Sequence, residues 1–170
     1  MKFNKSGKGF ILLSLLTLLS LNVLGQKNKL DKQEQIKKLI ESRIFVFSPQ
    51  SASPASGASI QLTTEFFLKF NQDTLDSYLP YFGVENQPRF GSNDGPLRFT
   101  STDFEYELKT SKNGGYDIII KLNDPTDPDQ INLSVSASGY ANVRVISHSR
   151  QPISFYGDID APRAPRKSNR

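Results

Sequence analysis

The spacing of apolar residues changes once along the chain, from a helical period to a period of two. Residues 30–42 place Ile36, Leu39 and Ile40 on one face of a helix, with charged residues around the other side. A helix of this length is marginal in isolation. We therefore expect the apolar stripe to pack against the rest of the protein.

From residue 44 onward, short runs of β-branched and aromatic residues alternate with turn-forming sequence, which is typical of strands. Two segments rich in Pro, Ser, Gly or Asn, residues 48–59 and 86–96, are predicted to be loops. About nine strands are predicted, at residues 44–47, 60–62, 66–70, 74–79, 104–108, 116–122, 131–135, 141–145 and 153–156.

The clearest β-hairpin is predicted over residues 102–122. Phe104, Tyr106 and Leu108 alternate with acidic residues before the turn, and the sequence YDIIIKL follows it. The Asn-Gly pair at 113–114 is a strong hairpin signal, because both residue types tolerate positive φ. The three apolar residues of the first strand are expected to face the core.

This succession predicts an α+β fold that is mostly β, with an N-terminal helix packed on a curved antiparallel meander sheet. No strand–helix–strand alternation follows the first helix, which argues against a parallel sheet. The pattern fits an open sheet and a partial barrel equally well, although closure would remove exposed strand edges.

Residues 1–25 are predicted to be a signal peptide. Lys2, Lys5 and Lys8 precede a nearly unbroken apolar run over residues 10–24, and Gly25 stands at its end. This order is typical of export signals, and the run is shorter than the ~20 residues that span a bilayer. We therefore expect a periplasmic or secreted protein without a permanent membrane anchor.

The rest of the chain is expected to form a single α+β domain over residues 26–157 and a flexible basic tail over residues 158–170. After Asp158 the sequence is polar, contains prolines and shows no periodicity. Because the segment lacks a periodic pattern of apolar residues that could pack on the core, it is expected to contribute little to the stability of the fold.

The net charge of +4 averages unlike segments. Residues 1–25 and 163–170 hold seven of the 21 basic residues and no acidic ones, which leaves 14 basic and 17 acidic residues, a net charge of −3. A slightly acidic body lacks the dense cationic surface that phosphate backbones require. Nucleic acid is therefore not an expected partner.

Four stretches of the sequence together resemble a known family: SYLPYFG (77–83), GPLRFTSTDFEYELK (95–109), GYANVRV (139–145) and RQPISFYG (150–157). Their order and spacing are similar to those of exported Bacteroidota proteins grouped as domain of unknown function 4251. The resemblance covers roughly residues 33–157. It implies a secreted or periplasmic bacterial protein, and it transfers no catalytic residue because the family has no established activity.

Ten of the eighteen aromatic residues lie between residues 66 and 106, and most are expected in the core. Tyr81, Phe82 and Phe90 differ, because flanking Pro and Gly residues disfavour regular strands there. With Arg98 nearby, they are predicted to line a surface that binds an apolar or anionic ligand. The alternative is a loop folded back to plug the sheet.

No catalytic residue, metal site or cofactor is predicted. With no Cys and one His, thiolate and multi-His sites are excluded. Asp103, Glu105 and Glu107 fit the solvated face of a strand. The prolines among the acidic residues of 123–130 indicate a turn rather than a calcium loop. His148 is expected to be a lone exposed side chain.

The sequence favours a non-catalytic envelope protein that binds a small apolar ligand or a protein partner. The alternative is a carboxylate-dependent hydrolase acting in the periplasm. That chemistry needs two carboxyl groups in split environments, and the sequence singles out no such pair.

The export signal predicts that the mature protein begins at Gln26. Intact-mass measurement on protein from the native envelope fraction checks this, and a species that retains Met1 would contradict it.

Overall fold

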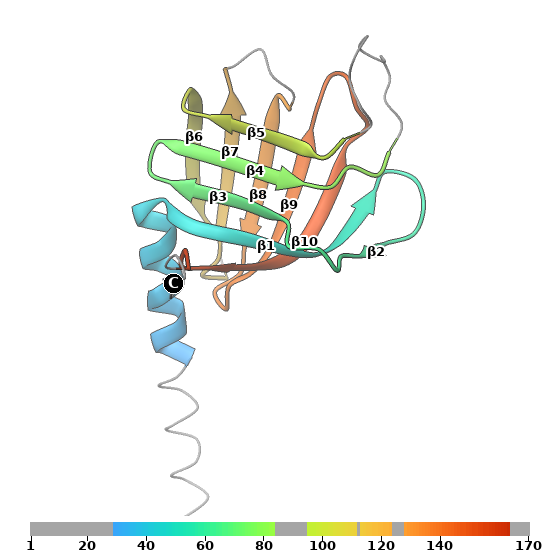
Figure 1. Cartoon of the computed structure of the whole chain (residues 1–170). Helices are drawn as coiled ribbons and strands as arrows, with labels where there is room; N and C mark the ends of the chain where they lie inside the picture. The colour runs from blue at the N-terminus through green and yellow to red at the C-terminus, as the bar shows by residue number, and fades with distance from the viewer. Residues whose placement is uncertain (1–28, 84–94, 112, 124–127, 164–170) are drawn as a thin grey trace, which may run out of the picture.

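The computed structural model describes residues 29–83, 95–111, 113–123 and 128–163 (Figure 1). The predicted signal peptide lies outside these residues. Within them, residues 29–42 are helical and ten strands follow. The strands are β1 (Ile44–Pro54), β2 (Ile60–Gln61), β3 (Phe67–Asn71), β4 (Thr74–Leu79), β5 (Leu97–Ser101), β6 (Phe104–Thr110), β7 (Tyr116–Leu122), β8 (Gln130–Val135), β9 (Tyr140–Ile146) and β10 (Ile153–Asp160).

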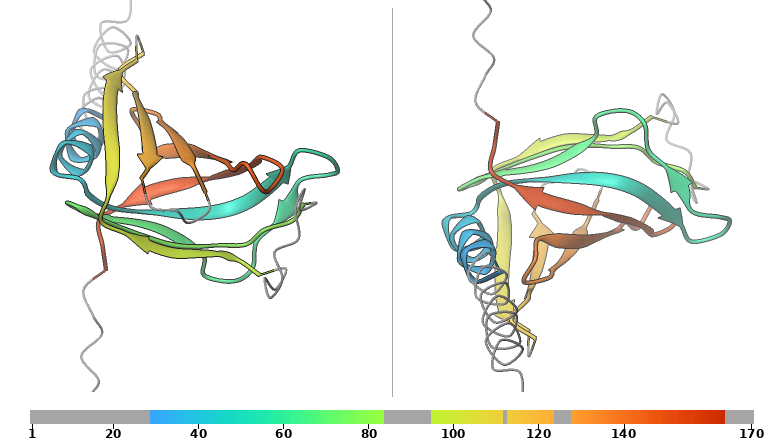
Figure 2. Two further views of the ribbon diagram at one scale, coloured as in Figure 1. Left: turned by 90° about the horizontal axis from the view of Figure 1, so that it is seen from above. Right: turned by 90° about the horizontal axis from the view of Figure 1, so that it is seen from below.

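The strands form one antiparallel sheet in the order β5-β4-β3-β1-β10-β9-β8-β7-β6, and β2 pairs with β1. Two meanders, β3–β5 and β6–β10, are thus joined by the pairing of β1 with β10. The sheet curves into a barrel-like shape, with β5 and β6 at its two ends (Figure 2). The predicted fold class, an N-terminal helix with a curved antiparallel sheet, is confirmed.

Apolar side chains that alternate inward along the strands fill the interior of the curved sheet. Phe45 of β1 stacks on Phe70 of β3 with ring centroids 4.6 Å apart. The Phe70 ring in turn meets the edge of Tyr106 from β6, at 6.0 Å. Rings from β1, β3 and β6 therefore pack together, although β6 ends the sheet far from β1 and β3 in strand order.

The helix docks on this core as predicted. Ile36 and Ile40 are fully buried, whereas Leu39 packs at the margin. Gly139, in the β8–β9 turn, has a φ of 94°, and a Cβ there would lie 2.9 Å from Ile36 Cδ1. A glycine is therefore required both for the turn and for the close approach of the helix. No helix among the described residues is long and apolar enough to cross a membrane.

The prediction of a loop over residues 48–59 was wrong for its first half, because β1 continues to Pro54. Ser48–Pro54 pairs with β10, and a register shift between Pro49 and Ser51 places a bulge beside the first proline. Ala52 is fully buried in this segment. Pairing partners far along the chain, rather than local apolar content, make this sequence a strand.

The predicted boundary between domain and tail at residue 158 was also wrong. β10 runs to Asp160, and Ile159 is only 1% exposed. The Ile159 N–H donates to the carbonyl oxygen of Gly139 at 2.9 Å. The inward alternation of Ile153 and Phe155 thus continues past the expected end of the domain.

The predicted hairpin is formed by β6 and β7, and Gly114 has the positive φ, 73°, at its turn. Phe104 and Tyr106 pack against the core as expected. Leu108 does not, since it is 39% exposed on the terminal strand of the sheet. Leu108 is exposed because β6 is an end strand of the sheet and has a neighbouring strand on one side only.

Candidate functional site

The structure places three of the four predicted ligand-binding residues, and Phe90 lies outside the described residues. Tyr81 packs against the core, with the guanidinium of Arg150 4.9 Å from its ring centroid. Its hydroxyl donates to the carbonyl oxygen of Gln151 at 3.3 Å. Tyr81 is therefore held by contacts with the segment before β10.

The other two residues of the predicted set are more exposed. Phe82 is 36% exposed, and the Arg98 guanidinium lies 5.7 Å from the ring of Tyr78, its neighbour across β4 and β5. Tyr81 and Arg98 thus each pair with a different partner. A ligand-binding role for Tyr81, Phe82, Phe90 and Arg98 stays a prediction.

The acidic strand predicted to face solvent does so. Glu105 and Glu107 are exposed, and both form ion pairs with Lys121, at 3.6 and 3.5 Å. The charge of Glu107, together with its hydrogen bond, and the charge of Glu105 raise the pKa of Lys121. Asp103 accepts a hydrogen bond from the Asn123 amide at 2.9 Å.

His148 is exposed, as expected, but it is not alone. Its Nδ1 lies 2.7 Å from Oδ1 of Asp129, at the start of β8. The neighbouring Ser147 Oγ accepts hydrogen bonds from the backbone N–H groups of Ser149 and Arg150, at 3.0 and 3.1 Å. Ser147 therefore stabilises a turn.

Two of the acidic residues considered for calcium, Asp124 and Asp127, lie outside the described residues. Within the part of the chain that the structure describes, no three His, Asp or Glu side chains converge as metal ligands would. Asp129 is committed to the contact with His148.

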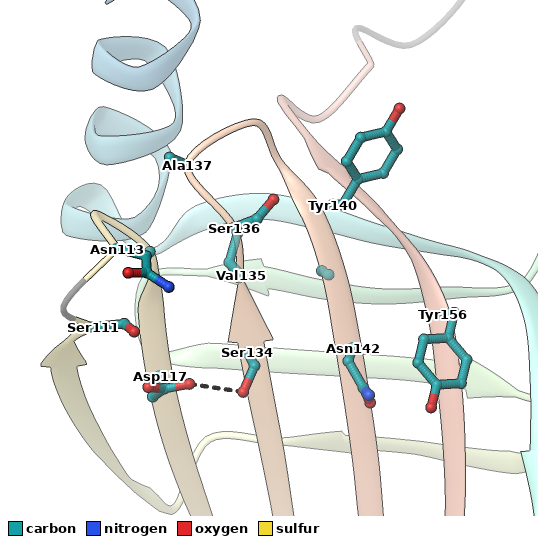
Figure 3. Close-up of a pocket in the computed structure, with 12 residues that line it drawn as sticks. Ser111, Asn113, Asp117, Ser134, Val135, Ser136, Ala137, Tyr140, Asn142 and Tyr156 are labelled. Carbon is teal, nitrogen blue, oxygen red and sulfur yellow. Dashed lines mark hydrogen bonds between the residues drawn. The ribbon is translucent and has the colours of Figure 1, made fainter.

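A hollow that the sequence analysis missed lies on the outer face of β7–β10 (Figure 3). It is an open surface depression with a volume of about 430 Å³. We call it the tyrosine hollow, after its two exposed aromatic side chains. The side chains that define it are those of Ser111, Asp117, Ser134, Tyr140, Asn142 and Tyr156.

Strand register aligns the polar residues of the tyrosine hollow. Asp117 stands opposite Ser134, Ser134 opposite Asn142, and Asn142 opposite Tyr156. These four side chains form one row across four strands (Figure 3). The Ser134 hydroxyl donates to Asp117 Oδ1 at 2.7 Å.

Tyr140 lies diagonally from Tyr156 on the same face, since its own partner on β10 is Asp158. Diagonal neighbours on a sheet have Cβ atoms about 7–8 Å apart, so both rings border the same hollow. Tyr140 is 70% exposed and Tyr156 49% exposed. Neither hydroxyl, nor the Asn142 amide, forms a hydrogen bond with another described residue.

The backbone under the tyrosine hollow is rigidly supported. Ile118, Leu133, Val143 and Phe155 alternate with the row residues and are at most 1% exposed. Their side chains fill the interior directly behind the site. The only sequence signal for the hollow was the outward phase of Tyr140 and Tyr156, which does not reveal that cross-strand register brings them together.

A second groove, of about 580 Å³, follows β1, β3 and β10. Four carboxylates line it, together with Lys69 and Arg163. Two of these carboxylates already accept hydrogen bonds, Asp158 from Gln50 at 2.7 Å and Asp76 from Thr100 at 3.1 Å. This groove therefore combines apolar side chains, among them Val46, Phe66 and Phe67, with carboxylates that in part already accept hydrogen bonds.

The placement of the loop aromatics generates a stability prediction. Tyr81→Ala should lower the free energy of unfolding by about 2–4 kcal/mol, because it removes a ring packed on the core. Phe82→Ala should lower it by about 1 kcal/mol or less, since that ring is more exposed. Urea denaturation of both variants measures the difference, and equal losses would contradict this assignment.

Comparisons with known proteins agree with this fold. The model of the family described as domain of unknown function DUF4251 matches residues 27–159. A crystal structure of a DUF4251 family protein from Bacteroides eggerthii is similar, with a TM-score of 0.56 and 14% sequence identity. The match covers 76% of this chain and 87% of that one. No curated protein matches the sequence. The chain therefore belongs to the DUF4251 family, as its sequence resemblance predicted.

Proposed function

We propose that this protein is an exported, non-catalytic binding module that holds a ligand in the tyrosine hollow. The observation that carries the proposal is the pair of exposed tyrosines beside the Asn142 amide, which has no hydrogen-bond partner among the described residues, on a sheet backed by buried side chains. Packing does not account for Tyr140 and Tyr156, which are 70% and 49% exposed. Tyrosines presented in this way are common in recognition surfaces.

The filled interior supports a site on the outside. Large apolar side chains occupy the space inside the curved sheet, including Phe45, Phe47, Phe70 and Phe155, all fully buried. A ligand inside would have to displace part of this core, at a high cost in stability. The outer face of β7–β10 can bind a ligand without such a change.

The chemistry of the hollow favours a ligand with both polar and apolar surface. The sequence alone suggested a small apolar ligand or a protein partner. Tyr140 and Tyr156 supply apolar rings, whereas Asp117, Ser134 and Asn142 supply hydrogen-bonding groups. This mixture fits a purely apolar ligand poorly.

The hydrolase alternative has less support. A carboxylate-dependent hydrolase needs one protonated and one ionised carboxyl group near the scissile bond. Glu105 and Glu107 share one exposed environment with Lys121. Asp117 is the single carboxylate among the described residues of the hollow.

Export is supported by the basic and apolar N-terminal sequence, residues 1–25. A binding module placed in the envelope or outside the cell would meet soluble or surface-bound ligands directly. Intact-mass measurement of the mature protein, which should begin at Gln26, tests this part of the proposal.

Chemical-shift mapping tests the proposed site. The mature protein is titrated with a neutral hexasaccharide, an uncharged tetrapeptide and laurate, and amide shifts are followed by NMR. At least one probe should shift residues on the outer face of β8, β9 and β10. The double variant Tyr140→Ala/Tyr156→Ala should abolish these shifts, whereas Phe82→Ala, which removes an exposed ring outside the hollow, should keep them.

Two outcomes would contradict the proposal. Shifts centred on Tyr81, Phe82 and Arg98 would move the site to the loop aromatics. No shift in the hollow with any of the probes would leave Tyr140 and Tyr156 without a binding role.

A further inference from the structure

We propose that the ligand of the tyrosine hollow is a neutral oligosaccharide. This inference rests on the proposed function and narrows it to one class of ligand. It is carried by three properties of the site: its charge, the position of its apolar atoms, and the length of its polar row.

The charge of the hollow disfavours an anionic ligand. Its described lining contains one carboxylate, Asp117, and no cationic side chain. Lys109 stands opposite Asp117 on β6 but does not line the hollow. Phosphate and carboxylate ligands are held by Arg, Lys or clustered N–H groups, so a ligand without charge fits this lining best.

The position of the apolar atoms disfavours a lipid chain. Val135 and Ala141 belong to the lining, but they are only 3% and 6% exposed and belong to the core. The apolar surface offered to a ligand is therefore that of the two tyrosine rings, with the single methyl group of Ala137 beside them. An aromatic face carries partial negative charge and can pack against the C–H face of a sugar ring.

The polar groups match a ligand rich in hydroxyls. Asp117 accepts one hydrogen bond from Ser134 and retains acceptor capacity on both oxygens. The Asn142 amide both donates and accepts, and it has no partner among the described residues. A sugar hydroxyl can donate to the carboxylate and accept from the amide at the same time.

The length of the row favours a chain of sugars over a single one. Asp117 on β7 and Tyr156 on β10 are three strand spacings apart. At about 4.8 Å for each spacing, the row is roughly 14 Å long. Tyr140 extends the site along β9 from this row. An oligosaccharide lying across the strands can contact a tyrosine ring at one end and Asp117 at the other.

Calorimetric titration of the mature protein tests this inference. The probes are neutral hexasaccharides of glucose, N-acetylglucosamine, mannose and xylose, with polygalacturonate hexasaccharide, an uncharged tetrapeptide and laurate for comparison. At least one neutral hexasaccharide should bind more tightly than the three comparison probes. Its Kd should change less than twofold between about 50 and 500 mM salt, because no ligand charge is screened.

Variants of the hollow separate stacking from hydrogen bonding. Tyr156→Ala and Asn142→Ala should each weaken binding by about tenfold or more, a loss of roughly 1.4 kcal/mol. Tyr156→Phe retains the ring and should retain most of the affinity. Phe82→Ala, which removes an exposed ring outside the hollow, is the control and should bind normally.

The outcomes distinguish this inference from the function on which it rests. If the tetrapeptide or laurate binds at the hollow and none of the neutral sugars does, the inference of an oligosaccharide ligand is overturned, whereas the proposed binding function is retained. Binding of the acidic sugar alone, weakened by salt, would also overturn it. No binding of any probe would overturn both.

Discussion

The pairing of β1 with β10 is the constraint on which the rest of the structure depends. It joins the β3–β5 meander to the β6–β10 meander, which otherwise share no strand neighbour. Gly157 stands opposite Pro49 in this pair of strands, and a Cβ there would overlap the carbonyl oxygen of Ser48 and lie 2.9 Å from Pro49 Cα. The bulge after Pro49 and the missing side chain at Gly157 let the two strands approach.

The pairing of β1 with β10 also bears on where the proposed ligand would bind. By uniting the two meanders, it brings Phe45 and Phe70 on one side near Ile118 and Phe155 on the other, in one continuous core. The helix adds Ile36 and Ile40 to that core. Because the interior is filled, the proposed binding uses the outer face, where β10 also contributes Tyr156 to the tyrosine hollow.

The sequence predicted those parts of the fold whose signal is local. Alternation identified β6, β8 and β9, the Asn-Gly pair identified the hairpin turn that leads into β7, and the spacing of Ile36 and Ile40 identified the docked helix. Residues 48–54, 97–101 and 158–160 were missed. Residues 48–54 pair with 153–158, and residues 158–160 pair with 46–48, so both take their strand character from partners about a hundred residues away. Residues 97–101 form β5 by pairing with β4. Exposed tyrosines on separate strands become a site only through register, which one sequence does not specify. The contact of Arg150 with Tyr81 was also missed, because it joins two segments that are far apart in the chain.

The residues that hold the fold are distinct from those proposed to bind a ligand, and one comparison of unfolding free energies tests that distinction most directly. Gly157→Ala should lower the free energy of unfolding by about 3 kcal/mol or more, because a methyl group has no room against the backbone of β1. Ser154→Ala, on the same strand, is the control, because it adds no atoms and should leave the free energy of unfolding nearly unchanged. The Tyr140→Ala/Tyr156→Ala variant should stay within about 1 kcal/mol of the unaltered protein, since both rings are exposed. A loss in the double tyrosine variant as large as that in Gly157→Ala would contradict the account, because it would make the tyrosines part of the fold.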